Sequence, residues 1–180
     1  MGKTTACRML TARFGLVHIE TDLSLPPDVR LRPLDGPDSV WDGDAQELCG
    51  RLIHAAQAAS PYLMKQALKL SETSGRWVLE GERVHPALAA RLTTMGIACG
   101  VFIVETDARR IDATLRVRLP RFGALLERRQ RAVAEVNRLY NLWLIDEAAH
   151  YEVACIESQP WETLADRLLK RSWQRATLPN

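Results

Sequence analysis

The first residues of the chain combine a glycine, a lysine and two hydroxyl side chains at the start of a predicted helix. Gly2-Lys3-Thr4-Thr5 leads into the helical pattern of residues 3–14, which Gly15 ends. The four residues match the last part of the phosphate-binding pattern G-x-x-x-x-G-K-[ST]. In that pattern backbone N–H groups hold phosphate oxygens, the lysine reaches the terminal phosphates and the hydroxyl binds Mg²⁺. We therefore predict nucleotide binding by Gly2, Lys3, Thr4 and Thr5; the alternative is a frayed, solvated N-terminus.

Two acidic side chains follow predicted strands. The strand 16–19 leads into Glu20-Thr21-Asp22, and the strand 77–80 ends in Glu80 ahead of Gly81. Ligands of parallel sheets bind beyond the carboxyl ends of the strands. Asp22 is predicted to orient an acceptor hydroxyl or accept its proton, and Glu80 is predicted to hold Mg²⁺ together with Thr4. The alternatives are a helix cap or turn former at Asp22 and a strand-end charge at Glu80.

Arginines gather in one part of the chain. Residues 108–138 hold nine arginines against three acidic residues. Most of the nine are predicted to be surface charges on helices. Arg118 and Arg121 flank Leu119-Pro120, where the helix should break, and we predict that they contact a transferring phosphate. Arg30 and Arg83 are predicted to bind an anionic substrate group, with a solvated loop charge as the alternative for Arg30.

Short apolar runs alternate with longer helical patterns, which predicts an α/β domain with a mainly parallel sheet. The predicted helices cover residues 3–14, 44–58, 61–72, 86–95, 108–119, 125–150 and 161–173, and the strands cover 16–19, 77–80, 100–105 and 153–157. Ser60 and Pro61 predict a new helix start after residue 58, because serine caps helices and proline suits the first turn. Two Glu-Thr-Asp triplets, 20–22 and 105–107, each follow a strand.

Composition limits the classes of protein. The 180 residues suit one domain, and 47% hydrophobic with 26% charged residues indicates a globular core. The longest mostly apolar stretch, 95–104, is about half a membrane span, and the first residues do not resemble a signal peptide, so we expect a cytoplasmic protein without membrane contact. A net charge of +2 argues against nucleic-acid binding. The four cysteines and four histidines show no metal-ligand spacing, so buried thiols are expected.

Several of these features occur together, in the same order, in a known group of enzymes. They are Gly2-Lys3-Thr4-Thr5, the run 18–22 with Arg30, the run 78–81 with His85-Pro86, the arginine-rich segment and the run 155–158. In these features the chain resembles the P-loop small-molecule kinases related to 2-phosphoglycerate kinase, chloramphenicol phosphotransferase, zeta toxin and gluconate kinase. The resemblance implies a P-loop NTPase three-layer sandwich, a single domain over 1–180 with 108–138 as its lid, and ATP and Mg²⁺ as cofactors.

One strand of that fold has no counterpart in the chain. In those kinases the strand before the phosphate loop is central, in the order 2-3-1-4-5, whereas this sequence begins inside the loop. The strands at Trp77 and Val101 should then face each other across a missing partner, with unpaired backbone groups that cost roughly 1–3 kcal/mol each. We expect about 10–20 further residues upstream of Met1.

The leading functional prediction is an ATP-dependent phosphotransferase that acts on a small hydroxylated metabolite. Lys3 would hold the nucleotide, Asp22 would position the acceptor, and Arg118 and Arg121 would neutralise charge during transfer. Two alternatives stay open: a non-catalytic relic or binding module that kept the scaffold, and a P-loop nucleotide hydrolase.

Overall fold

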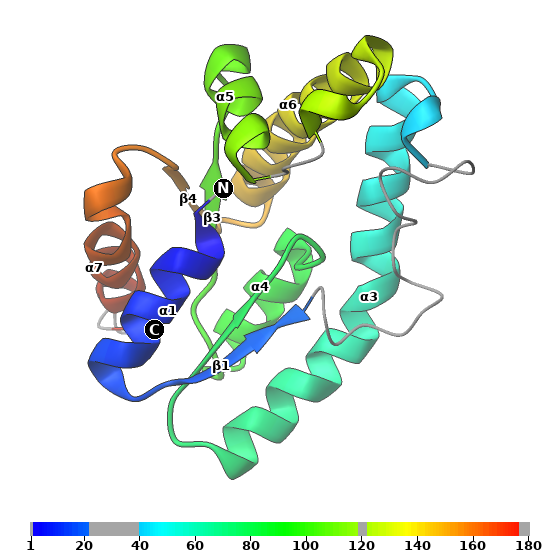
Figure 1. Cartoon of the computed structure of the whole chain (residues 1–180). Helices are drawn as coiled ribbons and strands as arrows, with labels where there is room; N and C mark the ends of the chain where they lie inside the picture. Colours follow the sequence, from blue (N-terminus) through cyan, green and yellow to red (C-terminus); the bar gives the residue numbers. More distant parts are fainter. Residues whose placement is uncertain (1, 22–39, 119–121, 177–180) are drawn as a thin grey trace.

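The computed structural model describes residues 2–21, 40–118 and 122–176 (Figure 1). The strands are β1 (Val17–Glu20), β2 (Trp77–Glu80), β3 (Val101–Val104) and β4 (Ala154–Glu157). The α-helices are α1 (Lys3–Phe14), α3 (Ala45–Thr73), α4 (Pro86–Thr94), α5 (Ala108–Arg118), α6 (Glu127–His150) and α7 (Leu164–Ala176). Three short 3₁₀ turns are η2 (Val40–Asp42), η3 (Phe122–Ala124) and η4 (Trp161–Thr163).

The four strands form two separate parallel pairs. β1 pairs with β2, from Val17 opposite Trp77 to Glu20 opposite Glu80. β3 pairs with β4, from Val101 opposite Ala154 to Val104 opposite Glu157. Among the described residues no ladder joins β2 to β3. Parallel neighbours need long crossovers, which here run through α3 for the first pair and through α5 and α6 for the second.

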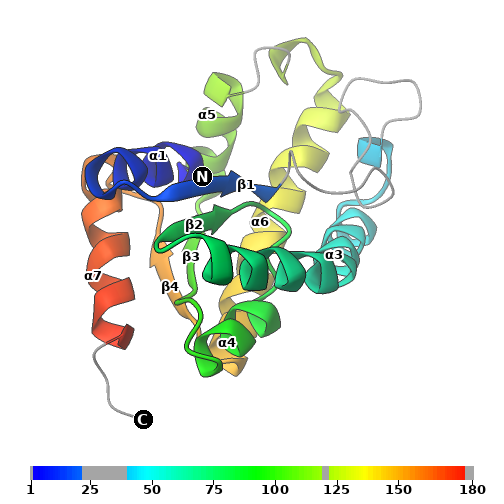
Figure 2. The ribbon, with the colours of Figure 1, turned by 90° about the horizontal axis from the view of Figure 1, so that it is seen from below.

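Helices cover both faces of the strands (Figure 2). Side chains alternate along a strand, so neighbours point to opposite faces. Ile103 packs with Ala6 of α1 and Leu168 of α7. Val104, the next residue, packs with Leu48 of α3 and Leu144 of α6. The arrangement therefore has three layers, with α1 and α7 on one side of the strands and α3 and α6 on the other.

A cavity of about 470 Å³ lies between the two pairs of strands. Its lining includes Val78 and Leu79 of β2, Val101 and Ile103 of β3, and Leu10 of α1. At about 24 cal/mol per Å³, a closed void of this size would cost about 11 kcal/mol, which is comparable to the ~5–15 kcal/mol stability of a whole domain. The two strand pairs are thus arranged around a space that they do not fill themselves.

The helix α3 corrects one prediction. Residues 44–58 and 61–72 were expected as two helices, but α3 runs unbroken from Ala45 to Thr73 with Pro61 inside it. Its buried side chains keep helical spacing through the proline: Leu52, Ala56, Ala59, Leu63, Ala67 and Leu70. The Ser60 hydroxyl donates to the Ala56 carbonyl instead of capping a new helix. A continuous buried stripe therefore outweighs the backbone hydrogen bond that Pro61 cannot make.

The other predicted elements agree with the structure to within one to three residues where they are described. α1 has the predicted bounds, and Gly15 ends it in the left-handed region at φ 63°. Met9, predicted to face the core, is 54% exposed, and Cys7 is buried instead. In the described part of the chain, no helix combines the length and the apolar character that crossing a bilayer requires.

Candidate functional site

The start of α1 lies at the carboxyl end of β2. The Thr4 hydroxyl donates a hydrogen bond of 2.7 Å to Oε1 of Glu80. Glu80 is the last residue of β2 and is 8% exposed. Two residues that the sequence assigned to one Mg²⁺ site, 76 positions apart, are therefore in direct contact. Lys3 lines the same cavity as Glu80 and Gly81.

Gly2 forms the N-cap of α1 under tight constraints. Its φ of 82° lies in the left-handed region, which favours glycine. A Cβ atom there would come within 2.2 Å of Cζ3 of Trp161, in η4. No side chain caps the first turn of α1, so its N–H groups carry the partial positive charge of the helix end. Thr5, the fourth predicted nucleotide-binding residue, is exposed in this turn.

Two further side chains join Glu80. His18, Glu20 and Glu80 each place a ligand atom within 4.8 Å of the others. His18 and Glu20 are two residues apart on β1 and so share one face, and Glu20 is the register partner of Glu80. His18 Nε2 is buried without a hydrogen-bond partner and lies 3.6 Å from Glu80 Oε1. Glu20 Oε1 accepts from Arg8 at 2.9 Å.

Sequence reasoning missed His18 and Glu20. Spacing along the chain showed no metal pattern, because the three ligands come from two strands about sixty residues apart. The usable signal was the alternation in His18-Ile19-Glu20, combined with a second carboxylate at the end of the neighbouring strand. Thr4 and Glu80 supply the oxygen donors that Mg²⁺ prefers, so the residues present fit that ion.

The thiol next to this cluster is inert. Cys7 is buried one turn after Thr4. Burial, reinforced by the negative charges of Glu80 and Glu20 and opposed by Lys3, raises the pKa of Cys7 to about 12. The side chain therefore stays a neutral thiol near neutral pH and is unsuited to act as a nucleophile.

The loop after β2 contributes a buried cation. Arg83 is 5% exposed, and its Nη1 has no hydrogen-bond partner. A guanidinium does not lose its proton in a protein, so its burial calls for an anion nearby. His85, close by, has a structural role: its Nδ1 accepts from the N–H of Ala87 at 3.1 Å and caps α4.

The remaining predicted site residues are not described. Asp22, Arg30 and Arg121 lie outside the described residues, and so does the side chain of Arg118, the last residue of α5. Most described arginines of 108–138 have carboxylate partners. These pairs are Arg110 with Glu105, Arg116 with Asp112, Arg128 and Arg129 with Asp42, Arg131 with Glu127, and Arg138 with Glu135. These charges therefore hold the helices and their neighbours, as predicted for the majority.

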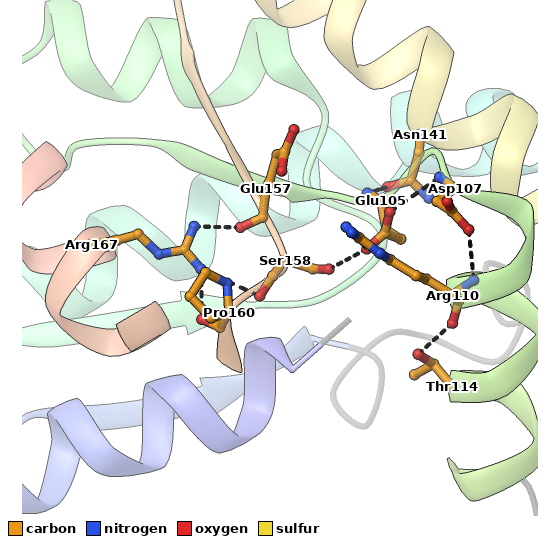
Figure 3. A network of polar contacts seen from close by, with 9 residues as sticks. All are labelled: Glu105, Asp107, Arg110, Thr114, Asn141, Glu157, Ser158, Pro160 and Arg167. Carbon is orange, nitrogen blue, oxygen red and sulfur yellow. Dashed lines mark hydrogen bonds and ion pairs between the residues drawn. The ribbon is translucent and has the colours of Figure 1, made fainter. Parts of the chain in front are cut away.

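A second buried carboxylate follows β3 (Figure 3). Glu105, 7% exposed, accepts from the Ser158 hydroxyl at 2.8 Å and from the Asp107 N–H at 3.1 Å. Arg110 lies 3.9 Å from its other side. Arg167 donates to the carbonyls of Glu157 and Pro160, which fixes the chain after β4. All of these groups serve to hold the ends of β3 and β4 together.

A scan against protein-family models and searches of curated proteins and of solved structures find no match to this chain.

Proposed function

We propose that this protein is an ATP-dependent phosphotransferase that acts on a small hydroxylated metabolite. The observation that carries the proposal is the 2.7 Å hydrogen bond between Thr4 and the buried carboxylate of Glu80. It joins a glycine-lysine-threonine helix start to a strand-end acid, the pair that holds Mg²⁺ in phosphate-binding loops. The uncapped first turn of α1 and the nearby Lys3 add positive charge at the same place.

Each residue then has a defined task. The first-turn N–H groups of α1 and the Lys3 ammonium bind the terminal phosphates of ATP. Thr4 and Glu80 would hold Mg²⁺, which supplies charge neutralisation on the phosphate oxygens. Arg83, a buried cation without a printed partner among the described residues, suits an anionic group of the acceptor. Arg118 and Arg121 are proposed to contact the phosphoryl group, and Arg30 the acceptor.

The reaction transfers one phosphoryl group. The acceptor hydroxyl oxygen forms a bond to the γ-phosphorus of ATP, and the bond between that phosphorus and the β,γ-bridging oxygen breaks. ADP leaves with the electron pair of the broken bond. The hydroxyl proton passes to a carboxylate, for which we propose Asp22.

The test measures binding first and turnover second, on the full-length protein. Titration with ATP in the presence and absence of Mg²⁺ gives a dissociation constant, and ADP release over a panel of hydroxylated metabolites gives turnover. Lys3→Ala should abolish turnover and weaken ATP binding at least ~10-fold, since a charge-assisted contact to phosphate is lost. Lys69→Ala, an exposed lysine on α3, is the matched control and should change neither.

Three outcomes count against the proposal. ATP binding that Lys3→Ala leaves unchanged removes the assigned role of the helix start. ADP release that needs no acceptor indicates a nucleotide hydrolase. A folded full-length protein that binds no ATP indicates a binding module that kept the scaffold only.

A further inference from the structure

Backbone groups of β2 and β3 face each other across the central cavity. In a parallel ladder the N–H and C=O of alternate residues point to the same side. The N–H of Val17 donates to the carbonyl of Arg76, so even-numbered residues of β2 point to β1, and Leu79 points away from it. The N–H of Ser158 donates to the carbonyl of Val104, so the even residues of β3 point to β4, and Ile103 points away.

Both of these unoccupied edges line one cavity. Leu79 and Ile103 are among its lining residues, and within the described residues no backbone hydrogen bond connects β2 with β3. Only at the carboxyl end does a substitute partner occur: the N–H of Glu105 donates to Oδ1 of Asn141, a side chain of α6, at 3.0 Å. The edges of two parallel pairs thus present donors and acceptors to the same space.

The helix α1 supplies the direction and the connection. It begins at the carboxyl end of β2, where Thr4 contacts Glu80, and Leu16 links it to the start of β1. A helix that runs from the carboxyl edge of a sheet back to the amino edge is the second part of a strand–helix–strand crossover. Lys3, Cys7 and Leu10 of this helix also line the cavity. The first strand of that crossover would end beside Gly2, inside the gap.

We propose that the groove between β2 and β3 is the seat of a fifth strand, parallel to both, formed by the polypeptide segment that leads into Gly2. This strand would join the two pairs into one sheet of order β1-β2-new-β3-β4. Its side chains should be apolar and β-branched, because helices cover both faces of the sheet. The proposal concerns the sheet alone and stands whether or not the protein transfers phosphate.

A segment of the same chain suits the groove better than a strand from another molecule. The gap lies in the centre of the sheet, with α1 and α7 on one face and α3 and α6 on the other, so a separate chain would have to thread between the layers (Figure 2). A segment joined to Gly2 already has its last residue at the carboxyl edge and needs only a short strand-to-helix loop.

The experiment adds a strand to the existing chain. One form of the protein carries a five-residue strand of alternating valine and isoleucine, followed by a six-residue glycine-serine loop, ahead of Gly2. A matched form carries the same extension with proline at the second and fourth strand positions, because proline cannot donate to a ladder. Both are compared with the chain as printed above by thermal unfolding and by amide hydrogen exchange.

The valine-isoleucine form should unfold about 5–10 °C higher than the unextended chain. The amides of Leu79, Val101 and Ile103 should exchange at least ~100-fold more slowly relative to those of Val78 and Phe102, which already face β1 and β4. The proline form should show neither change. Equal protection in both extended forms would overturn the proposal, as would no protection in either. Protection that rises with protein concentration would show insertion into a neighbouring molecule and would overturn it as well.

Discussion

Two glutamates with nearly equal burial stand at corresponding places in the two halves of the molecule. Glu80 ends β2 and is 8% exposed; Glu105 follows β3 and is 7% exposed. Glu105 accepts hydrogen bonds from the Asp107 N–H and the Ser158 hydroxyl and lies near the Arg110 guanidinium. Glu80 accepts from Thr4, and among the described residues its other neighbour in this range is His18 at 3.6 Å.

The difference separates a structural carboxylate from one that can bind a ligand. A buried carboxylate whose oxygens are filled by protein donors holds its surroundings in place. A buried carboxylate with open acceptor positions, close to a second acid and an unpartnered imidazole nitrogen, can take a cation. Burial alone therefore does not identify the candidate site in this protein, whereas the count of donors to each carboxylate does.

The largest expected effect tests that distinction by activity. Glu80→Gln keeps an oxygen acceptor for Thr4 but removes the negative charge, so phosphotransfer by the full-length protein should fall about 100-fold or more, equivalent to ~2.7 kcal/mol. Its melting temperature should change little. Steady-state ADP release with saturating acceptor measures the effect. A comparable loss per folded molecule in Glu105→Gln would erase the functional contrast between the two acids.

The second prediction concerns the place where the halves meet, at Gly2 and Trp161. Gly2→Ala forces a left-handed residue to carry a Cβ and pushes it into the Trp161 ring, at a combined cost of about 2–5 kcal/mol. Gly15→Ala is the matched control, because Gly15 has φ 63° and no heavy atom within 4 Å of its would-be Cβ. It should lose only ~1–2 kcal/mol. Urea unfolding measures both, and equal losses would mean that the Trp161 contact contributes nothing.

The third prediction tests the structural role of Glu105. Glu105→Gln replaces one acceptor oxygen by an amide group that faces a donor, either the Asp107 N–H or the Ser158 hydroxyl. An unsatisfied buried group of this kind costs about 1–3 kcal/mol of unfolding free energy. Chemical denaturation of Glu105→Gln beside Glu80→Gln gives the comparison. The idea fails if Glu80→Gln turns out to be the more destabilising of the two.

The smallest effect is a pH dependence in the loop after β2. Burial lowers the pKa of His85 from its usual 6.5, and the nearby Glu147 opposes this only in part. The folded state therefore binds fewer protons than the unfolded chain, so this contribution to stability is present above about pH 6.5 and is lost as the pH falls below it. His85→Asn keeps a cap acceptor for Ala87 and should lose less stability between pH 7 and pH 5 than the unaltered protein. His150→Asn, at an exposed position, should follow the unaltered protein in urea unfolding at both pH values.

Local patterns predicted much of the secondary structure because they act over a few residues. Gly15 and Gly96 end their helices at positive φ, as expected for residues without a Cβ. The strand at Trp77 has the predicted bounds. Pro61 was misread because its local preference for a helix start competes with a buried stripe that extends along all of α3. Met9 was misplaced because the apolar pattern of α1 did not show which of its faces meets the strands.

The sequence by itself determined the alternation of strands and helices and named Thr4 and Glu80 as partners, because residue types at strand ends and helix starts carry that information. Tertiary structure alone decided that His18 and Glu20 join them and that Glu105 does not offer the same chemistry. Parallel register and packing bring these groups together from distant parts of the chain, and the donors that surround a carboxylate are visible only once the chain is folded. The same packing leaves the inner edges of β2 and β3 facing a common cavity.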